Sequence, residues 1–183
     1  LLQVKKVPIK VKLFGPFTWT FKREALWSVH GPVIRGKHAT YAIRYANYED
    51  IRILEQWYRM NKATNYNEWE NAMQMMSIPM FGTGYADKEG NILYLYNAKL
   101  PIRTEGYDWQ GVLPGNLSKL VWTEYLPYKE LPQVLNPTSG FIQNCNNTPF
   151  ITTTGDNNPN QEKYSKTFGI ESRMSNRALR ALE

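Results

Sequence analysis

The sequence has few of the residues that build redox, metal and membrane-spanning structures. Among 183 residues there are one cysteine and two histidines. A single cysteine, Cys145, excludes a disulfide within the chain, and His30 and His38 are too few for a histidine-based metal site. No apolar run reaches the roughly 18 residues that a membrane-spanning helix needs. The sequence therefore predicts no cofactor of its own and no membrane span.

Several motifs that identify enzymes and nucleic-acid binders are missing as well. The chain contains no phosphate-binding loop, no dinucleotide fingerprint and no Gly-x-Ser-x-Gly turn. Its formal charge of +6 comes from lysines and arginines that are scattered along the chain, so a nucleic-acid partner is not expected. Cys145 has no histidine near it in the sequence and is interpreted as a small buried residue rather than a nucleophile.

The chain does have the apolar content of a folded protein, with 42% hydrophobic and 14% aromatic residues. We expect one α+β unit over residues 1–183. Apolar and polar residues alternate over residues 4–14 and 18–27, with a Gly-Pro pair between them, which predicts a β-hairpin. Shorter strands are expected at residues 30–34 and 41–45.

Helical periodicity occurs in three places: residues 49–60, the segment after Asn65, and residues 171–183. Asn65 and Glu68 have the spacing of a capping box, and Pro79 is expected to end the helix that follows. Residues 88–91 predict a turn between two strands, with Gly90 where a positive φ is needed. Residues 101–137 are rich in proline, glycine and aromatic side chains, which predicts a long irregular segment of the kind that often carries function.

Residues 136–149 form the most unusual stretch, in which four asparagines, two prolines and one glycine surround two large apolar side chains. Asparagine amides are paired donors and acceptors, so this cluster indicates a polar site on a rigid backbone. Asn146 is a candidate oxyanion-hole donor, because a neutral amide stabilises developing negative charge without acting as a nucleophile. The alternative is a turn asparagine that caps backbone groups, and the residues alone leave both open.

Six short blocks follow one another along most of the chain: Ser28–Val33, Trp57 ahead of Asn67–Trp69, Tyr85–Ile92, Tyr107–Gly111 with Leu113–Pro114, Asn136–Pro137 with Ser139–Gly140, and Asn144–Pro149. In this order they resemble the β subunit of the penicillin acylase family of N-terminal-nucleophile amidohydrolases. Residues 93–97 and 143–146 are most similar to the branch that includes aculeacin acylase and acyl-homoserine-lactone acylases. The resemblance implies part of an αββα sandwich with antiparallel strands, a few helices and long loops.

The resemblance also implies a chemistry. In this family a serine freed by self-cleavage starts the β subunit and attacks the amide, with its own α-amino group as base. Residue 1 here is leucine, so the resemblance implies an internal fragment of a parent acylase that is inactive alone. Asn146 matches the asparagine that holds the oxyanion. Arg173 matches the arginine that orients the site, with Arg177 as a rival.

Further expectations follow from the same resemblance. Trp57 matches an aromatic residue of the acyl pocket, with a plain core tryptophan as the alternative, and Met80 and Phe81 fall near another pocket position. The substrate would be a small acyl amide of the penicillin or acyl-homoserine-lactone type. The partners would be the α subunit and the rest of the β subunit of a periplasmic or secreted bacterial protein. The family's calcium ligands lie largely outside this chain, so no metal site is assigned to it.

Two other functions remain open at this point. A non-catalytic module would bind carbohydrate or peptide by stacking on the aromatic residues of the irregular segment, namely Tyr107, Trp109, Trp122, Tyr125 and Tyr128. A basic nucleic-acid binder would show a steep dependence of binding on salt, which is not expected here.

Overall fold

The computed structural model describes residues 2–183. By its residue contacts the chain falls into two compact units. One comprises Leu1–Tyr45 and Pro114–Val121, and the other comprises Ala46–Leu113 and Trp122–Glu183. Each unit has its own antiparallel sheet, which confirms the predicted mixture of antiparallel strands and a few helices. The expectation that residues 1–183 act as one unit of a larger subunit stays a prediction.

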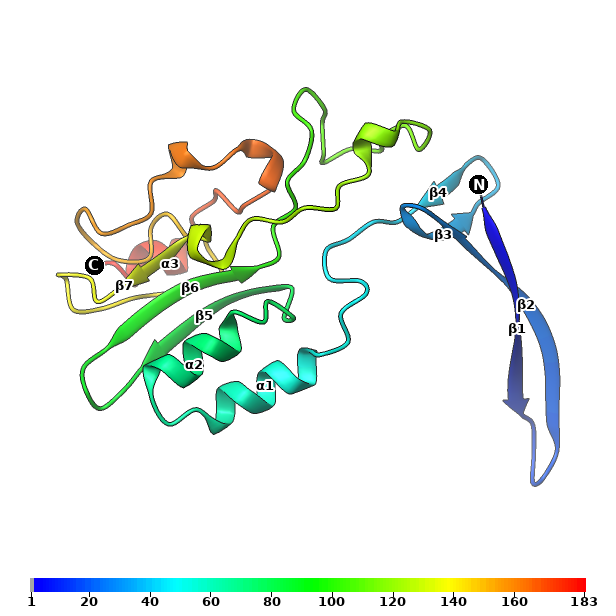
Figure 1. The fold of residues 1–183 in the computed structure, drawn as a ribbon, viewed down its shortest axis with the longest axis horizontal. Coiled ribbons are helices and arrows are strands. Elements are labelled where there is room, and N and C mark those ends of the chain that lie inside the picture. The colour runs from blue at the N-terminus through cyan, green and yellow to red at the C-terminus, as the bar shows by residue number, and fades with distance from the viewer. Residues whose placement is uncertain (1) are drawn as a thin grey trace. The chain divides into compact units, whose positions relative to one another are not determined.

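The first unit is built on a four-stranded sheet with the order β1-β2-β3-β4 (Figure 1). Its strands are β1 (Gln3–Lys12), β2 (Thr18–Ser28), β3 (Gly31–Arg35) and β4 (Thr40–Ala42). The antiparallel ladder of β1 and β2 confirms the predicted hairpin, whereas β4 ends earlier than expected. Gly31 has a φ of 124°, and a Cβ there would lie 2.4 Å from the Ile43 carbonyl oxygen. Glycine is therefore required where the chain after β4 approaches β3.

The second unit is built on a three-stranded sheet with the order β5-β6-β7. Strands β5 (Met80–Ala86) and β6 (Ile92–Ala98) form the expected hairpin, whose turn contains Gly90 with a φ of 92°. Strand β7 (Gln133–Leu135) pairs with β6 and was not expected, because its three residues lie within the proline-rich segment. Strand β6 lies at the centre of the core, since Leu93, Tyr94 and Leu95 are buried.

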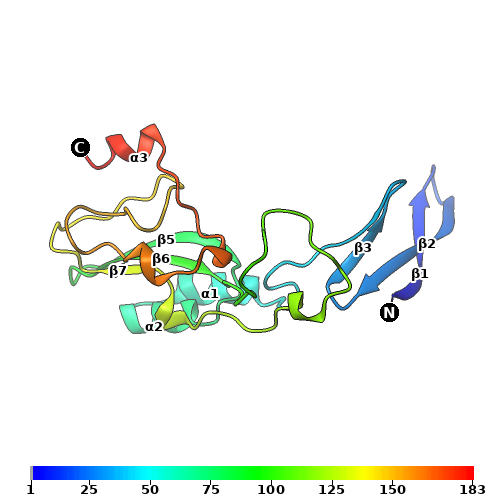
Figure 2. The same ribbon diagram turned by 90° about the horizontal axis from the view of Figure 1, so that it is seen from above.

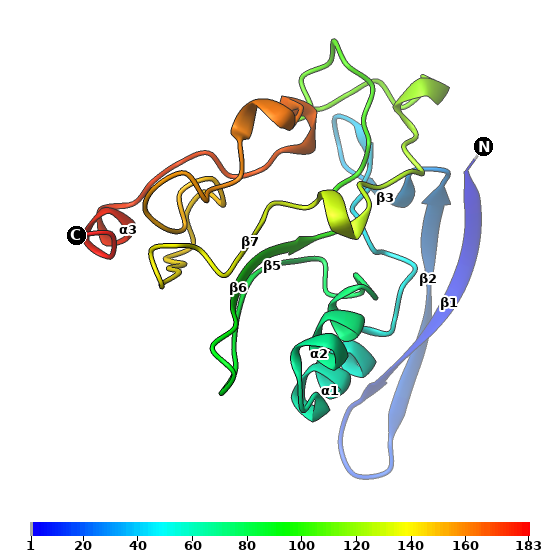
Figure 3. The ribbon, with the colours of Figure 1, turned by 60° about the vertical axis from the view of Figure 1, so that its left-hand side comes forward.

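Two helices cover one face of this second sheet, as Figures 1 and 3 show. They are α1 (Ile53–Lys62) and α2 (Tyr66–Met73). The predicted cap is confirmed, because Asn65 Oδ1 accepts a hydrogen bond from the Glu68 backbone N–H at 3.0 Å. On the inner side of α2, Trp69 and Met73 pack in the hydrophobic core with the leucines of β6.

Both helices differ from the prediction at one end. Helix α1 begins at Ile53 rather than at residue 49. The Asp50 carboxylate accepts the backbone N–H of Arg52, and this bond closes a turn ahead of the helix. Helix α2 ends at Met73, so Pro79 is not the residue that stops it. The stop comes earlier because Met76 has a φ of 49°, which an α-helix cannot contain. No helix within residues 2–183 is both long and apolar enough to cross a bilayer.

The link from α2 to β5 is held by buried polar side chains. Gln56 on α1 is fully buried, and its Oε1 accepts the backbone N–H groups of Ser77 at 2.7 Å and Ile78 at 2.9 Å. The Ser77 hydroxyl in turn donates to the Asp50 carboxylate at 2.8 Å. These bonds satisfy backbone groups that no strand or helix pairs, and they fix the position at which β5 begins.

The other face of the second sheet is covered by residues 136–175, which are largely irregular (Figure 2). The short helical turns of the chain are 3-10 helices at Ser118–Leu120, Tyr128–Glu130, Gln161–Lys163 and Lys166–Phe168. Helix α3 (Asn176–Arg180) is shorter than the predicted helix over residues 171–183. It starts late because Glu171 Oε1 accepts the Arg173 backbone N–H at 2.8 Å, and Ser175 is the extended residue that caps Ala178.

Candidate functional site

Strand β5 presents different candidate residues on its two faces. Side chains alternate along a strand, so Met80 and Gly82 share one face and Phe81 belongs to the other. Phe81 meets Trp57 of α1, with ring centroids 6.0 Å apart in an edge-to-face arrangement. On the opposite face, Gly82 contacts Asn144 of the asparagine-rich segment. The structure thus brings Trp57 and Phe81 together and places Met80 on the face of the asparagine-rich segment.

The asparagine-rich segment is anchored at its start on the β5–β6 hairpin. Asn136 has a φ of 47°. Its Oδ1 accepts the Ile92 backbone N–H at 2.8 Å, and its Nδ2 donates to Asn91 Oδ1 at 3.1 Å. Further along, the Gln143 backbone N–H donates to the Thr152 carbonyl oxygen at 2.7 Å. The Asn136 side-chain amide, together with a bond from the Asn136 backbone N–H to the Ile92 carbonyl oxygen at 2.8 Å, thus holds the start of this segment to the sheet.

Asn147 is the buried member of the cluster, with 5% of its surface exposed. Its Oδ1 accepts the Cys145 backbone N–H at 3.0 Å, and its Nδ2 donates to the carbonyl oxygens of Thr148 at 2.9 Å and Ile151 at 3.2 Å. Both ends of this amide are used to hold the loop. Cys145 itself is a free cysteine and is half-buried.

Asn146 is exposed and adopts a left-handed backbone conformation, with a φ of 55°. Asparagine tolerates this conformation better than most residues with a side chain. The backbone N–H of Asn146 donates to Asn144 Oδ1 at 3.0 Å. The turn-capping side chain is therefore that of Asn144, and the side chain of Asn146 is left for another contact.

The side chain of Asn146 is oriented by an arginine of α3. Arg177 Nη2 donates to Asn146 Oδ1 at 3.2 Å and to the Cys145 carbonyl oxygen at 2.9 Å. Because a guanidinium can only donate, this contact determines which end of the amide faces the arginine. The Nδ2 group has no hydrogen-bond partner among residues 2–183. The arrangement thus presents a neutral donor whose acceptor end is already engaged.

Arg173 lies elsewhere. Its Nε pairs with Glu171 Oε1 at 3.3 Å, and 88% of its side chain is exposed. The backbone N–H of Arg173, and then its guanidinium, hold the pKa of Glu171 below its usual value. Arg173 reaches the asparagine-rich segment through its backbone, because its carbonyl oxygen accepts the Thr148 N–H at 3.1 Å. Arg177, and not Arg173, is therefore the arginine in contact with Asn146.

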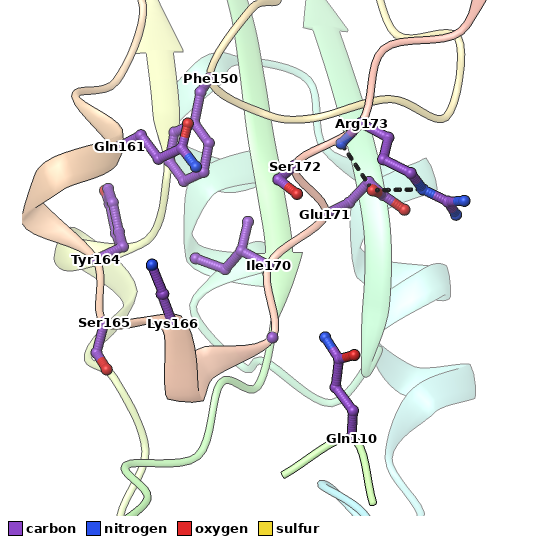
Figure 4. Close-up of a pocket in the computed structure, with 11 residues that line it drawn as sticks. Gln110, Phe150, Gln161, Tyr164, Ser165, Lys166, Ile170, Glu171, Ser172 and Arg173 are labelled. Atoms are coloured by element: carbon purple, nitrogen blue, oxygen red, sulfur yellow. Dashed lines mark hydrogen bonds and ion pairs between the residues drawn. The ribbon is translucent and has the colours of Figure 1, made fainter. Parts of the chain in front are cut away.

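Arg173 instead lines a pocket with a volume of about 610 Å³. Figure 4 shows Arg173 and Glu171, joined by hydrogen bonds, across the pocket from Phe150 and Tyr164. Burial raises the pKa of Tyr164. Asn146 is not among the residues that line this pocket, so the pocket and the Asn146 contact are separate features of the second unit.

The aromatic residues of the alternative binding module are engaged within the chain. Trp122 and Tyr128 are buried. The Arg103 guanidinium carbon lies 5.4 Å from the ring centroid of Trp109 and 5.8 Å from that of Trp122. Ring faces that a bound sugar would stack on are thus occupied by a cation of the protein itself. These contacts of Trp109 and Trp122 do not favour a stacking platform for a ligand at the two rings.

The described part of the chain does not gather metal ligands. Within residues 2–183, no three histidine, cysteine, aspartate or glutamate side chains lie close enough to hold an ion. Asp156 is exposed, and the side-chain oxygen of its neighbour Asn157 accepts from the backbone N–H and hydroxyl of Thr138 at 2.9 and 2.8 Å. These residues supply no cation cage by themselves, and the expectation that the chain carries no cofactor stays a prediction.

Sequence reasoning missed Asn144 and Gly82, whose contact joins the asparagine-rich segment to β5. The two residues are 62 positions apart, so no local periodicity relates them. The only available signal was the glycine itself, because a glycine inside a strand often marks a close approach of another chain segment.

The chain matches the family model described as penicillin amidase over residues 2–183. Penicillin G acylase of Escherichia coli is 35% identical over 128 residues, which are 67% of this chain and 15% of that protein. The acyl-homoserine lactone acylase PvdQ of Pseudomonas putida is 32% identical over 88 residues, which are 44% of this chain and 11% of that protein.

A solved structure shares the fold. The thermostable penicillin G acylase from Alcaligenes faecalis matches with a TM-score of 0.65 and 25% identity. The match covers 80% of this chain and 26% of that chain. The predicted fold class is thereby confirmed, and the chain spans only a small part of the length of the proteins it resembles.

Proposed function

The chain belongs to the penicillin amidase family, and on that premise we propose that it is a segment of an enzyme that hydrolyses the amide between an acyl group and an amine. The relatives it matches are named for penicillin G and for acyl-homoserine lactones. The activity belongs to the parent protein, because the segment spans 15% and 11% of those two relatives. The observation that carries the proposal is the orientation of the Asn146 amide by Arg177.

In the proposed reaction, a serine hydroxyl outside this segment attacks the amide carbonyl carbon. The serine's own α-amino group, with a pKa of about 8, accepts the hydroxyl proton at neutral pH. The carbonyl oxygen becomes an oxyanion, and Asn146 Nδ2–H donates to it. The proton then goes to the leaving amine, an acyl ester remains on the serine, and water hydrolyses that ester to the carboxylic acid.

Three features of Asn146 support the role of oxyanion donor. Its side chain is exposed, its Oδ1 is engaged by Arg177, and its amide is neutral, so it cannot lose a proton to the reacting groups. The positive charge on Arg177 also polarises the amide and strengthens the Nδ2–H group as a donor. Arg173, which the family resemblance favours, is the rival for the orienting role.

The acyl group is proposed to bind along strand β5. Trp57 and Phe81 supply an edge-to-face aromatic pair, of which Trp57 is 39% and Phe81 51% exposed. Met80 is 75% exposed and lies on the face of the Asn144 contact. Exposed apolar side chains are the usual lining of an acyl site, and of these three Met80 is the one that shares the face of the Asn144 contact.

The remainder of the parent acylase, both its α subunit and the rest of its β subunit, is the proposed partner. One face of the β1–β2 ladder supports this partner. On β1 it carries the exposed side chains of Val7, Ile9 and Val11. Their partners on β2 are Arg23, Phe21 and the exposed Trp19. Along this stretch only two strands pair, and an exposed apolar face of this kind marks a surface that a partner covers. By resemblance, the parent is a periplasmic or secreted bacterial protein.

Hydrolysis of an acyl-amide panel by the parent protein tests the proposal. The panel holds phenylacetyl amides and medium- to long-chain acyl amides, including acyl-homoserine lactones. We expect turnover of at least one class by the parent and none by chain 1–183. Trp57→Ala is expected to lower kcat/KM for the best acyl group by roughly tenfold, because it removes apolar contact. Enzyme-like turnover by chain 1–183 alone, or a parent that cleaves no amide, would refute the proposal.

Arg177→Met should lower kcat of the parent by about tenfold. The loss of roughly one charge-assisted hydrogen bond raises the activation free energy by the amount that gives this factor. The methionine keeps much of the side-chain length but cannot donate to Asn146, so the amide is free to turn its Nδ2 group away from the substrate. Steady-state kinetics on the best panel substrate measure the effect. Arg180→Met is the matched control on α3 and is expected to retain wild-type kcat, since Arg180 pairs with Glu183 at the chain end.

The same substitution at Arg173 decides between the two arginines. A loss confined to Arg177→Met supports the contact seen in the structure. A loss confined to Arg173→Met would instead assign the orienting role to the arginine that the resemblance favours, and would refute the role given to Arg177.

A further inference from the structure

One glycine of β5 allows the asparagine-rich segment to approach the sheet. Asn144 Nδ2 donates to the Gly82 carbonyl oxygen at 3.2 Å. A Cβ at Gly82 would lie 2.2 Å from that nitrogen and 3.1 Å from the Tyr94 hydroxyl oxygen. Gly84 lies on the same face, yet its Cβ would lie 3.7 Å from Ile142 Cδ1, which is an ordinary contact. The close approach is therefore specific to Gly82 and Asn144.

The other end of the Asn144 amide holds the candidate oxyanion donor. Asn144 Oδ1 accepts the backbone N–H of Asn146 at 3.0 Å. This bond supports Asn146 in its left-handed conformation, with a φ of 55°, which asparagine adopts more readily than most residues with a side chain. Asn144 thus joins strand β5 to the backbone of Asn146 through the two ends of one side chain.

We propose that Asn144 is a positioning residue that fixes Asn146 relative to strand β5, so that the acyl-binding strand and the oxyanion donor are held rigidly together. This inference rests on the proposed function, since it takes Asn146 to be the donor. Met80 shares a face with Gly82, so an acyl group against Met80 lies on the side of the strand where Asn144 is attached. Recognition of the acyl group and stabilisation of the oxyanion are then coupled through the Asn144 amide.

Kinetics of the parent acylase test the coupling. Gly82→Ala drives a Cβ into the Asn144 amide, and Asn144→Ala removes the amide. Each is expected to lower kcat by about tenfold to a hundredfold, because a catalytic group displaced by about 1 Å loses that much rate. KM should stay within about twofold, since the donor acts on the transition state. Gly84→Ala, on the same face of the same strand, is the matched control and should behave as wild type.

Further variants separate positioning from a general structural effect. Asn144→Asp keeps an oxygen for the Asn146 N–H but cannot donate to the Gly82 carbonyl, so it should lose as much kcat as Asn144→Ala. In the Asn144→Ala background, Gly82→Ala should add no further loss, because the two changes act through one contact. Tyr94→Phe removes the hydroxyl oxygen that would also lie close to a Cβ at Gly82. This change should neither lower kcat nor rescue Gly82→Ala.

The ¹⁵N–¹H TROSY spectrum of the parent acylase provides a reading that does not depend on activity. The backbone amide signal of Asn146 should move in Asn144→Ala and in Gly82→Ala, and stay in place in Gly84→Ala. Additive losses in the double variant, wild-type kcat for Asn144→Asp, or an unmoved Asn146 signal would each overturn the inference. Failure of the proposed function is seen separately, as wild-type turnover of Asn146→Ala.

Discussion

Asn146→Ala is expected to lower the turnover of the parent acylase by about 10²–10³, which is the usual cost of removing one oxyanion-hole donor. The loss should appear in kcat and leave KM nearly unchanged, because the oxyanion exists only along the reaction path. The structure supports a loss without rearrangement of the fold, since the Asn146 side chain is exposed and, within residues 2–183, its hydrogen bond is with Arg177 alone. Hydrolysis must be measured on protein whose self-cleavage is complete, so that the nucleophile is present.

Two further substitutions sharpen this test. Asn146→Asp keeps the shape of the side chain but replaces the donor with a carboxylate that repels the oxyanion, so its loss should be at least as large as that of alanine. Asn71→Ala is the matched control, because Asn71 is an exposed asparagine on α2, and it should retain wild-type turnover. Unchanged turnover of Asn146→Ala would make Asn146 a turn residue and remove the central support of the proposed function.

Gln56→Leu is expected to lower the free energy of unfolding by about 2–6 kcal/mol, because two buried backbone N–H groups lose their acceptor at about 1–3 kcal/mol each. The two groups belong to Ser77 and Ile78, which precede strand β5. Leucine has nearly the volume of glutamine and a similar helix propensity, so the change isolates the lost hydrogen bonds. Urea unfolding of chain 1–183, followed by circular dichroism, measures the difference.

The control for this prediction is Gln74→Leu. Gln74 is exposed at the end of α2, and substitution there should change the free energy of unfolding by no more than about 0.5 kcal/mol. A Gln56→Leu variant as stable as the wild type would show that Ser77 and Ile78 find other acceptors, and that β5 does not depend on α1 for its starting position.

The elements that the sequence predicts well are those whose signals are local. The β1–β2 hairpin follows from strict alternation, and the Asn65 cap and the Gly90 turn follow from single residues with known backbone preferences. The errors arise where a side chain further along the chain takes over. Met76 leaves the helical conformation because the two residues that follow it, Ser77 and Ile78, are bound by the Gln56 side chain. The sequence pattern of α2 contains no signal for those bonds.

In the candidate site, too, local signals could be recognised in the sequence and long-range contacts could not. Asn146 could be singled out from the composition of its segment and from the family resemblance, but the orientation of its amide comes from Arg177, which is 31 residues away. The resemblance singles out Met80 and Phe81 together as candidate pocket residues, and the alternation of strand β5 sends their side chains to opposite faces. Long-range contacts and the face that each strand residue occupies were therefore the parts that required the structure.

The most direct test of the central claim compares two inhibitors of the parent acylase. An alkylboronic acid forms a tetrahedral adduct with the serine and places a charged oxygen at the oxyanion position, whereas the carboxylic acid of the same chain length only fills the acyl site. If Asn146 is the oxyanion donor, Asn146→Ala should weaken the boronic acid by about 10²-fold or more and leave the affinity of the carboxylic acid unchanged. Equal weakening of both inhibitors, or of neither, would contradict the account.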